Sequence, residues 1–152
     1  MRPRLALSIV AAALMAAAPA LPQQHPTEQP KEGSEKEELT ADELADAIEA
    51  YIEDDADLKG GYFLVFDSVD KKPLALTLDK VHRDKLASIG NGVYFACTDM
   101  KATDGTAYDV DVFMVEDEDE VLQTTDIGIH KKAGKTRYTW KEEGGVWKKI
   151  TP

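Results

Sequence analysis

Cys97 is the only cysteine of this 152-residue chain, and a thiol can serve as nucleophile, metal ligand or disulfide partner. A single cysteine excludes an internal disulfide framework and a cysteine-based zinc finger. If Asp104-Gly105 forms a two-residue turn, Cys97 lies opposite Val112 on an apolar face. An apolar setting raises a thiol's pKa. We therefore predict a buried, unreactive cysteine, with an intermolecular disulfide as the first alternative and a nucleophile as the second.

Asp109 and Asp111 stand two residues apart, so both project from the same face of a strand. Paired carboxylates can perform acid–base chemistry or bind a hard cation. The simpler interpretation is the polar face of a half-exposed strand. Phe113 occupies the position where an EF-hand needs a third acidic or amide ligand, which excludes that motif. His82 and His130 could join Asp109 around zinc, but both resemble exposed strand-end residues and no histidine spacing supports such a site.

Five consecutive carboxylates occupy the segment 116–120. Glu116, Glu118 and Glu120 are weak candidates for calcium ligands, because a true site also needs backbone carbonyls and fixed geometry. Charge runs usually repel one another and stay solvated. The main prediction is therefore a solvated turn.

The C-terminal part has the opposite charge, with seven basic and two acidic residues between positions 131 and 149. Aromatic side chains lie among them, and such a mixture can stack on sugars or anchor a protein partner. Burial of one tryptophan with lysines around the sheet edge explains the same pattern. The candidate surface for a protein or glycan consists of Arg137, Tyr138, Trp140 and Trp147.

The sequence contains no nucleophile elbow, phosphate-binding loop, dinucleotide fingerprint or H-E-x-x-H zinc motif. We therefore predict a non-catalytic binding or interaction module, with no cofactor and with an unidentified protein or small molecule as ligand. One alternative is a small enzyme that uses Asp109 or Asp111 in a pocket between helix and sheet. The other is a calcium-responsive protein that uses the turn 116–120.

The first twenty residues predict export. A short basic segment precedes an apolar stretch, and Ala18-Pro19-Ala20 supplies small residues before a cut after Ala20. The apolar stretch is shorter than the ~20 residues of a spanning helix, so no membrane span should remain after cleavage. We expect a periplasmic or extracellular protein. Residues 21–38 are rich in proline and charge, which predicts a disordered linker before a single domain at 39–152.

The formal net charge of −11 argues against a nucleic-acid partner, since phosphates need a basic face. Acidic and basic regions lie at different positions along the chain, which could favour self-association.

Residues 40–43 form a capping-box pattern that predicts the start of a helix, and Leu44, Ile48 and Ile52 follow on one face. Gly60-Gly61 should end this helix. Beyond it the apolar residues alternate with a period of two, which indicates strands joined by hairpins. We predict an α+β fold in which one amphipathic helix packs on a curved antiparallel sheet of about six strands.

This layout resembles the cystatin-like and NTF2-like folds. The stretches 94–97, 104–111 and 137–140 are also similar to those of small secreted bacterial proteins of no assigned function. The resemblance implies a fold and no active site. The inhibitory loop Gln-x-Val-x-Gly of cystatins is absent here, so protease inhibition is not implied.

Overall fold

The computed structural model describes residues 39–84 and 87–151, which belong to one compact unit, Glu37–Pro152. The predicted signal peptide (1–20) and linker (21–38) lie outside the described residues. Among those described, no helix is both long enough and apolar enough to cross a membrane.

Helix α1 (Ala41–Leu58) begins as the sequence predicts. The Thr40 side chain accepts a hydrogen bond from the Glu43 amide, and the Glu43 carboxylate accepts one from the Thr40 amide. This reciprocal pair satisfies two of the amide groups that a helix start leaves without partners. The helix ends at Leu58, and Gly60 beyond it takes a positive φ of 76° that favours glycine.

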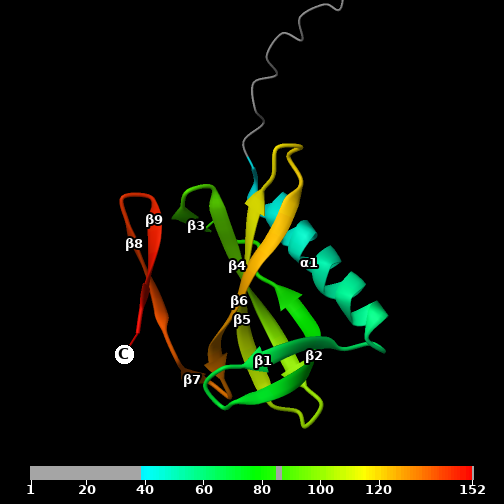
Figure 1. The fold of residues 1–152 in the computed structure, drawn as a ribbon. Helices are drawn as coiled ribbons and strands as arrows, with labels where there is room; N and C mark the ends of the chain where they lie inside the picture. Colours follow the sequence, from blue (N-terminus) through cyan, green and yellow to red (C-terminus); the bar gives the residue numbers. More distant parts are fainter. Residues whose placement is uncertain (1–38, 85–86, 152) are drawn as a thin grey trace, which may run out of the picture. The chain divides into compact units, whose positions relative to one another are not determined.

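An antiparallel sheet follows, with the strand order β1-β2-β4-β5-β6-β7 and β3 pairing with β4 (Figure 1). The last two strands, β8 and β9, form a separate hairpin. The strands are β1 (Phe63–Asp67), β2 (Lys72–Val81), β3 (Ala87–Gly90), β4 (Val93–Ala102), β5 (Ala107–Glu116), β6 (Leu122–Lys132), β7 (Lys135–Thr136), β8 (Thr139–Glu143) and β9 (Val146–Ile150). The predicted α+β layout, with one helix on a curved antiparallel sheet, is confirmed.

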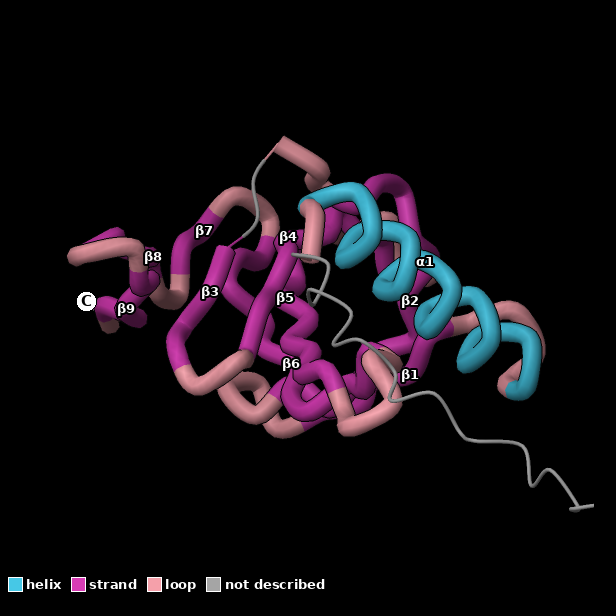
Figure 2. The backbone as a smooth tube through the Cα atoms, turned by 90° about the horizontal axis from the view of Figure 1, so that it is seen from above, coloured by secondary structure: helices cyan, strands magenta, loops and turns pink. Residues whose placement is uncertain are grey.

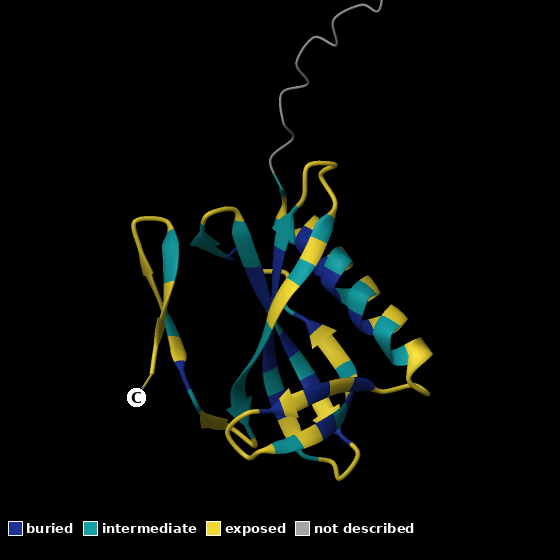
Figure 3. Ribbon diagram, in the orientation of Figure 1, coloured by how far each residue is buried: buried dark blue, intermediate teal, exposed yellow. Residues whose placement is uncertain are grey.

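The sheet carries a different layer on each face, as the view from above shows (Figure 2). Helix α1 covers one face, and the side of the helix toward the sheet is buried (Figure 3). Its buried side chains Leu44, Ile48 and Ile52 pack in one core with Val110 and Val112 of β5. Neighbouring residues of a strand point to opposite faces. Asp109 and Asp111 therefore lie on the face away from the helix.

The turn between β4 and β5 differs from the predicted one. Lys101 pairs with Ala107, and the Ala102 amide donates to the Thr106 carbonyl, so three residues, 103–105, form the loop. Gly105 takes a φ of 84° at its end. This moves the pairing by one residue, which changes the partner of every side chain along β4. Cys97 pairs with Asp111 and not with Val112. The predicted apolar setting of Cys97 is therefore wrong.

The β8–β9 hairpin packs on the face that α1 leaves uncovered. Phe95 and Phe113 of the sheet form a small second core with Trp140 and Trp147 of the hairpin. The rings of Phe95 and Trp140 lie 4.4 Å apart between centroids. Aromatic burial of this kind stabilises the packing of the hairpin on the sheet.

A buried ion pair fixes the base of the hairpin. Both guanidinium nitrogens of Arg137 donate to the Asp67 carboxylate at the end of β1, at 2.8 and 2.9 Å. The Asp67 carboxylate also accepts the amides of Val69 and Asp70. Burial tends to raise the pKa of Asp67, but the hydrogen bonds from Arg137 and these two amides outweigh it and lower the pKa to about 2.

Candidate functional site

A cleft of about 550 Å³ is lined by residues of the hairpin and of the outer face of β4, β5 and β6. Phe95, Trp140 and Trp147 supply apolar walls. Asp84, Asp99, Asp109 and Asp111 line the cleft with Lys131 as the only lysine or arginine among the described lining residues. The cleft therefore combines aromatic surface with an excess of negative charge.

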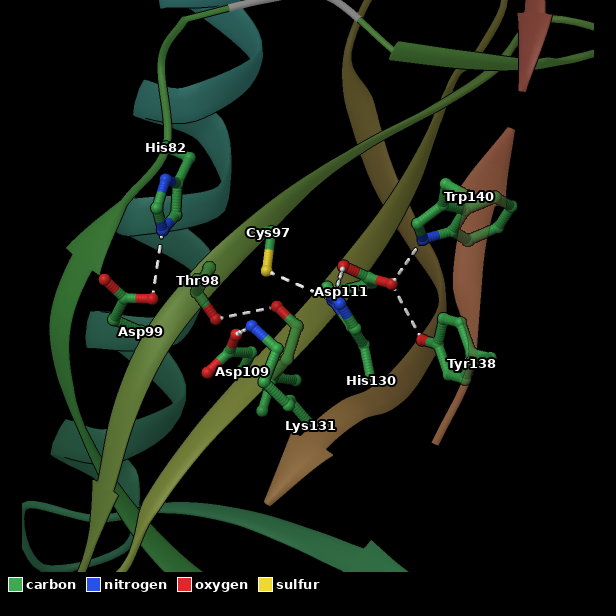
Figure 4. Close-up of polar contacts among 11 residues, drawn as sticks. His82, Cys97, Thr98, Asp99, Asp109, Asp111, His130, Lys131, Tyr138 and Trp140 are labelled. Carbon is green, nitrogen blue, oxygen red and sulfur yellow. Dashed lines mark hydrogen bonds and ion pairs between the residues drawn. The ribbon is translucent and has the colours of Figure 1, made fainter. Parts of the chain in front are cut away.

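Cys97, Asp111 and His130 meet on the sheet side of this cleft (Figure 4). Cys97 and Asp111 are direct partners across β4 and β5. The Nδ1 atom of His130 lies 3.6 Å from the Cys97 sulfur and 3.5 Å from Oδ1 of Asp111. One ligand atom from each residue lies within 4.8 Å of the other two, and among the described residues no other group of three or more histidine, cysteine or acidic side chains converges in this way.

A β-bulge supplies His130. Asp109 pairs with Lys131 and Val110 pairs with Ile129, so His130 is the extra residue of β6 between two successive pairs. Bulges break the regular ladder and redirect side chains, often near functional sites. Only about a fifth of the His130 side chain remains exposed, so it is a half-buried member of the cluster and not the exposed strand-end residue that we predicted.

The two oxygens of Asp111 have different surroundings. Oδ2 accepts hydrogen bonds from the Tyr138 hydroxyl at 2.7 Å and from the Trp140 indole at 2.8 Å. Oδ1 has no hydrogen-bond partner, and the whole Asp111 residue is buried. Buried carboxylate oxygens normally have donors. The hairpin thus holds Asp111 with one oxygen directed at the Cys97–His130 pair.

Gly128 makes room for this arrangement. It pairs with Asp111 across β5 and β6, and a Cβ atom at this position would lie 2.4 Å from the Tyr138 hydroxyl oxygen. Real Cβ atoms essentially never show such a contact. Glycine therefore leaves room for the Tyr138 hydroxyl to reach Asp111.

The surroundings of Cys97 disfavour its thiolate form. Burial raises its pKa well above the usual range, and the Asp111 carboxylate raises it further, followed by Asp109 and Asp99. A nucleophile–base–orienter triad also uses both ring nitrogens of its histidine. Here the thiol and Oδ1 of Asp111 face the same nitrogen of His130, so the geometry suits convergence on one atom better than proton relay.

Two further carboxylates line the cleft with basic partners. The Asp99 carboxylate lies 3.0 Å from Nε2 of His82, and the Asp109 carboxylate pairs with the Lys131 ammonium. Both pairs are partly exposed. The two pairs therefore lie on the cleft wall beside the Cys97–Asp111–His130 cluster and do not belong to it.

The predicted placement of Asp109 and Asp111 in a pocket between helix and sheet is wrong, because both lie on the opposite face, beside the hairpin. A groove of about 700 Å³ does run between α1 and the ends of β5 and β6, and it contains neither aspartate.

The acidic turn contains no converging ligand set among the described residues. Its Asp117 side chain accepts the amides of Asp119 and Val121 and the side-chain amide of Gln123. The backbone hydrogen bonds, that of Val121 first, lower the pKa of Asp117. Glu116 and Glu120 line the groove beside α1, and Glu118 is exposed. A calcium site on these glutamates stays a prediction.

The four residues of the predicted protein or glycan surface have different positions. Trp140 and Trp147 line the cleft. Arg137 forms an ion pair with Asp67, and Tyr138 is buried and donates a hydrogen bond to Asp111. Arg137 and Tyr138 therefore stabilise the interior of the molecule. Binding of a protein or glycan by all four residues together stays a prediction.

Comparison with protein-family models, curated proteins and solved structures gives no match for this chain. The resemblance to cystatin-like and NTF2-like folds therefore stays a prediction.

Proposed function

We propose that this protein is an exported, non-catalytic binding module that takes a small cationic ligand in the cleft between the sheet and the β8–β9 hairpin. The observation that carries the proposal is the chemical character of this cleft. Among the described residues, four aspartates line it with Lys131 as the one lysine or arginine, and two tryptophans and a phenylalanine form its walls. Aromatic faces attract cations because their π systems are negative.

The cleft also has the dimensions of a ligand site. Small-molecule pockets usually measure about 300–1,000 Å³ and combine apolar walls with a few placed polar groups. The volume of about 550 Å³ lies in this range. The aspartates that line the cleft attract a positively charged ligand.

Thermal unfolding of the full chain, freed of metals by chelation, tests the proposal. Zinc, choline and agmatine would be compared with acetate, phosphate and citrate. A ligand at 100 times its dissociation constant adds about 2.7 kcal/mol to the free energy of unfolding, which raises Tm by roughly 10 °C for a domain of this size. We expect at least one cation to produce such a shift and no anion to do so.

Two variants locate the binding. Trp147→Leu removes an aromatic wall of the cleft and should weaken binding of an organic cation. Phe66→Ala is the matched control, because Phe66 is 61% exposed on β1 and does not line the cleft. Equal shifts by cations and anions, or the absence of a shift with any cation, would refute the proposal.

A further inference from the structure

We infer that Cys97, Asp111 and His130 form a three-ligand site for a thiophilic divalent cation, with zinc as the best fit. This inference rests on the proposed function in one respect, the positive charge of the ligand, and it names the ligand's class and its contacts.

The distances agree with tetrahedral zinc coordination. Zinc bonds of about 2.3 Å to sulfur and about 2.0–2.1 Å to nitrogen and oxygen place tetrahedral ligands roughly 3.6 Å apart for sulfur and nitrogen, and roughly 3.3 Å apart for nitrogen and oxygen. The corresponding distances here are 3.6 Å between Cys97 and His130 and 3.5 Å between His130 and Asp111. His130 therefore needs little movement relative to the other two ligands, and the third pair, the Cys97 sulfur and the Asp111 carboxylate oxygen, lies within 4.8 Å.

The state of Asp111 is a second, independent indication. Its Oδ1 atom is buried, lacks a hydrogen bond and is directed at the other two ligands. A bound cation would satisfy it. Metal-binding carboxylates are commonly held by outer hydrogen bonds that fix their orientation. Tyr138 and Trp140 provide two such bonds on Oδ2.

The donor types select the metal. Thiolate and imidazole suit zinc and other late transition metals, whereas calcium and magnesium prefer sets made of oxygen alone. On binding, the cation replaces the thiol proton of Cys97, since a coordinating thiol is deprotonated. Sites with three protein ligands leave a fourth position, and here the three ligands line the cleft. A water molecule or a cleft ligand would complete the coordination there.

The test uses the metal-free full chain and cobalt(II) as a spectroscopic substitute for zinc. We expect one equivalent of cobalt to produce a thiolate-to-metal charge-transfer band in the near-ultraviolet, and zinc to abolish it by displacement. Cys97→Ser should remove the band. His130→Ala and Asp111→Asn should weaken zinc binding more strongly than Tyr138→Phe, for which loss of an outer hydrogen bond predicts about 10–100-fold.

Asp79→Asn is the matched control. Asp79 lies on β2, is more than half exposed, pairs with Lys101 and does not line the cleft. Its replacement removes one carboxylate and leaves the cleft unchanged, so zinc affinity should change by less than threefold. Circular dichroism of each variant establishes that it is folded, and Cys97→Ser keeps the size of the side chain.

Zinc affinity that is equal in wild type and Cys97→Ser would overturn the inference. A missing charge-transfer band in the folded wild type would also overturn it. If zinc does not bind while choline or agmatine raises Tm, the metal site is refuted and the proposed function stands. If no cation binds, both are refuted.

Discussion

Replacement of Gly128 by alanine should disrupt the support of Asp111 through a single contact. The new Cβ would lie 2.4 Å from the Tyr138 hydroxyl oxygen, whereas the next atoms, in the rings of Tyr138 and Phe113, lie at 3.4 and 3.7 Å. Tyr138 must therefore move and lose its 2.7 Å hydrogen bond to the Asp111 carboxylate. A hydrogen bond to a charged group contributes about 1.5–3 kcal/mol.

The higher strand preference of alanine partly offsets this loss of stability. Gly128 does not have a positive φ, and alanine in a strand interior is about 0.5–1 kcal/mol more favourable than glycine. The net loss for Gly128→Ala is therefore about 1–2 kcal/mol. In a Tyr138→Phe background the hydroxyl is absent, so the same replacement should be neutral or stabilising.

Urea unfolding of the four proteins, followed by tryptophan fluorescence in the presence of a chelator, measures this cycle. We expect a coupling free energy of about 1.5–3 kcal/mol between positions 128 and 138. If Gly128→Ala destabilises both backgrounds equally, the reasoning about the hydroxyl contact fails.

Two further predictions concern the frame around the site. The pKa of Asp67 falls from an ordinary 3.8 to about 2 on folding, so its ionised form contributes about 2 kcal/mol of stability above pH 4 that is lost as the pH falls through 2. The stability difference between wild type and Asp67→Asn should therefore shrink by about this amount between pH 5 and pH 2, and a constant difference would contradict the assignment. Gly105→Ala, at a φ of 84° with no neighbouring atom within 4 Å, should lower the free energy of unfolding by about 1–2 kcal/mol through backbone strain alone. An unchanged urea midpoint would show that the loop tolerates another geometry.

Local sequence signals were sufficient for the helix and the fold class. The capping box at Thr40 and the apolar stripe from Leu44 depend only on residues close in sequence, and both are found in the structure. The alternation after Gly61 likewise indicated strands.

The cluster could not be predicted because it depends on register. The sequence predicted a two-residue turn, whereas the structure has a three-residue loop that ends at Gly105. The predicted turn paired Cys97 with an apolar residue and so missed its contact with Asp111. The available signal was the alternation of Ala96, Thr98 and Met100 on β4, which continues the buried face of Val110 on β5. That alternation places Cys97 on the polar face.

His130 was missed for a different reason. Its position results from a bulge between β5 and β6, and no local pattern in β6 indicates an extra residue there. The role of Gly128 was missed because it concerns Tyr138, ten residues further along the chain and on a different layer. Contacts of this kind are set by tertiary packing.

X-ray absorption spectroscopy of the zinc-loaded full chain tests the central claim, a Cys97–Asp111–His130 zinc site, most directly. The account predicts one sulfur ligand at about 2.3 Å, with the remaining ligands being nitrogen or oxygen at about 2.0–2.2 Å. Loss of the sulfur signal in Cys97→Ser would identify the thiolate. A first shell without sulfur in the wild-type protein would contradict the claim.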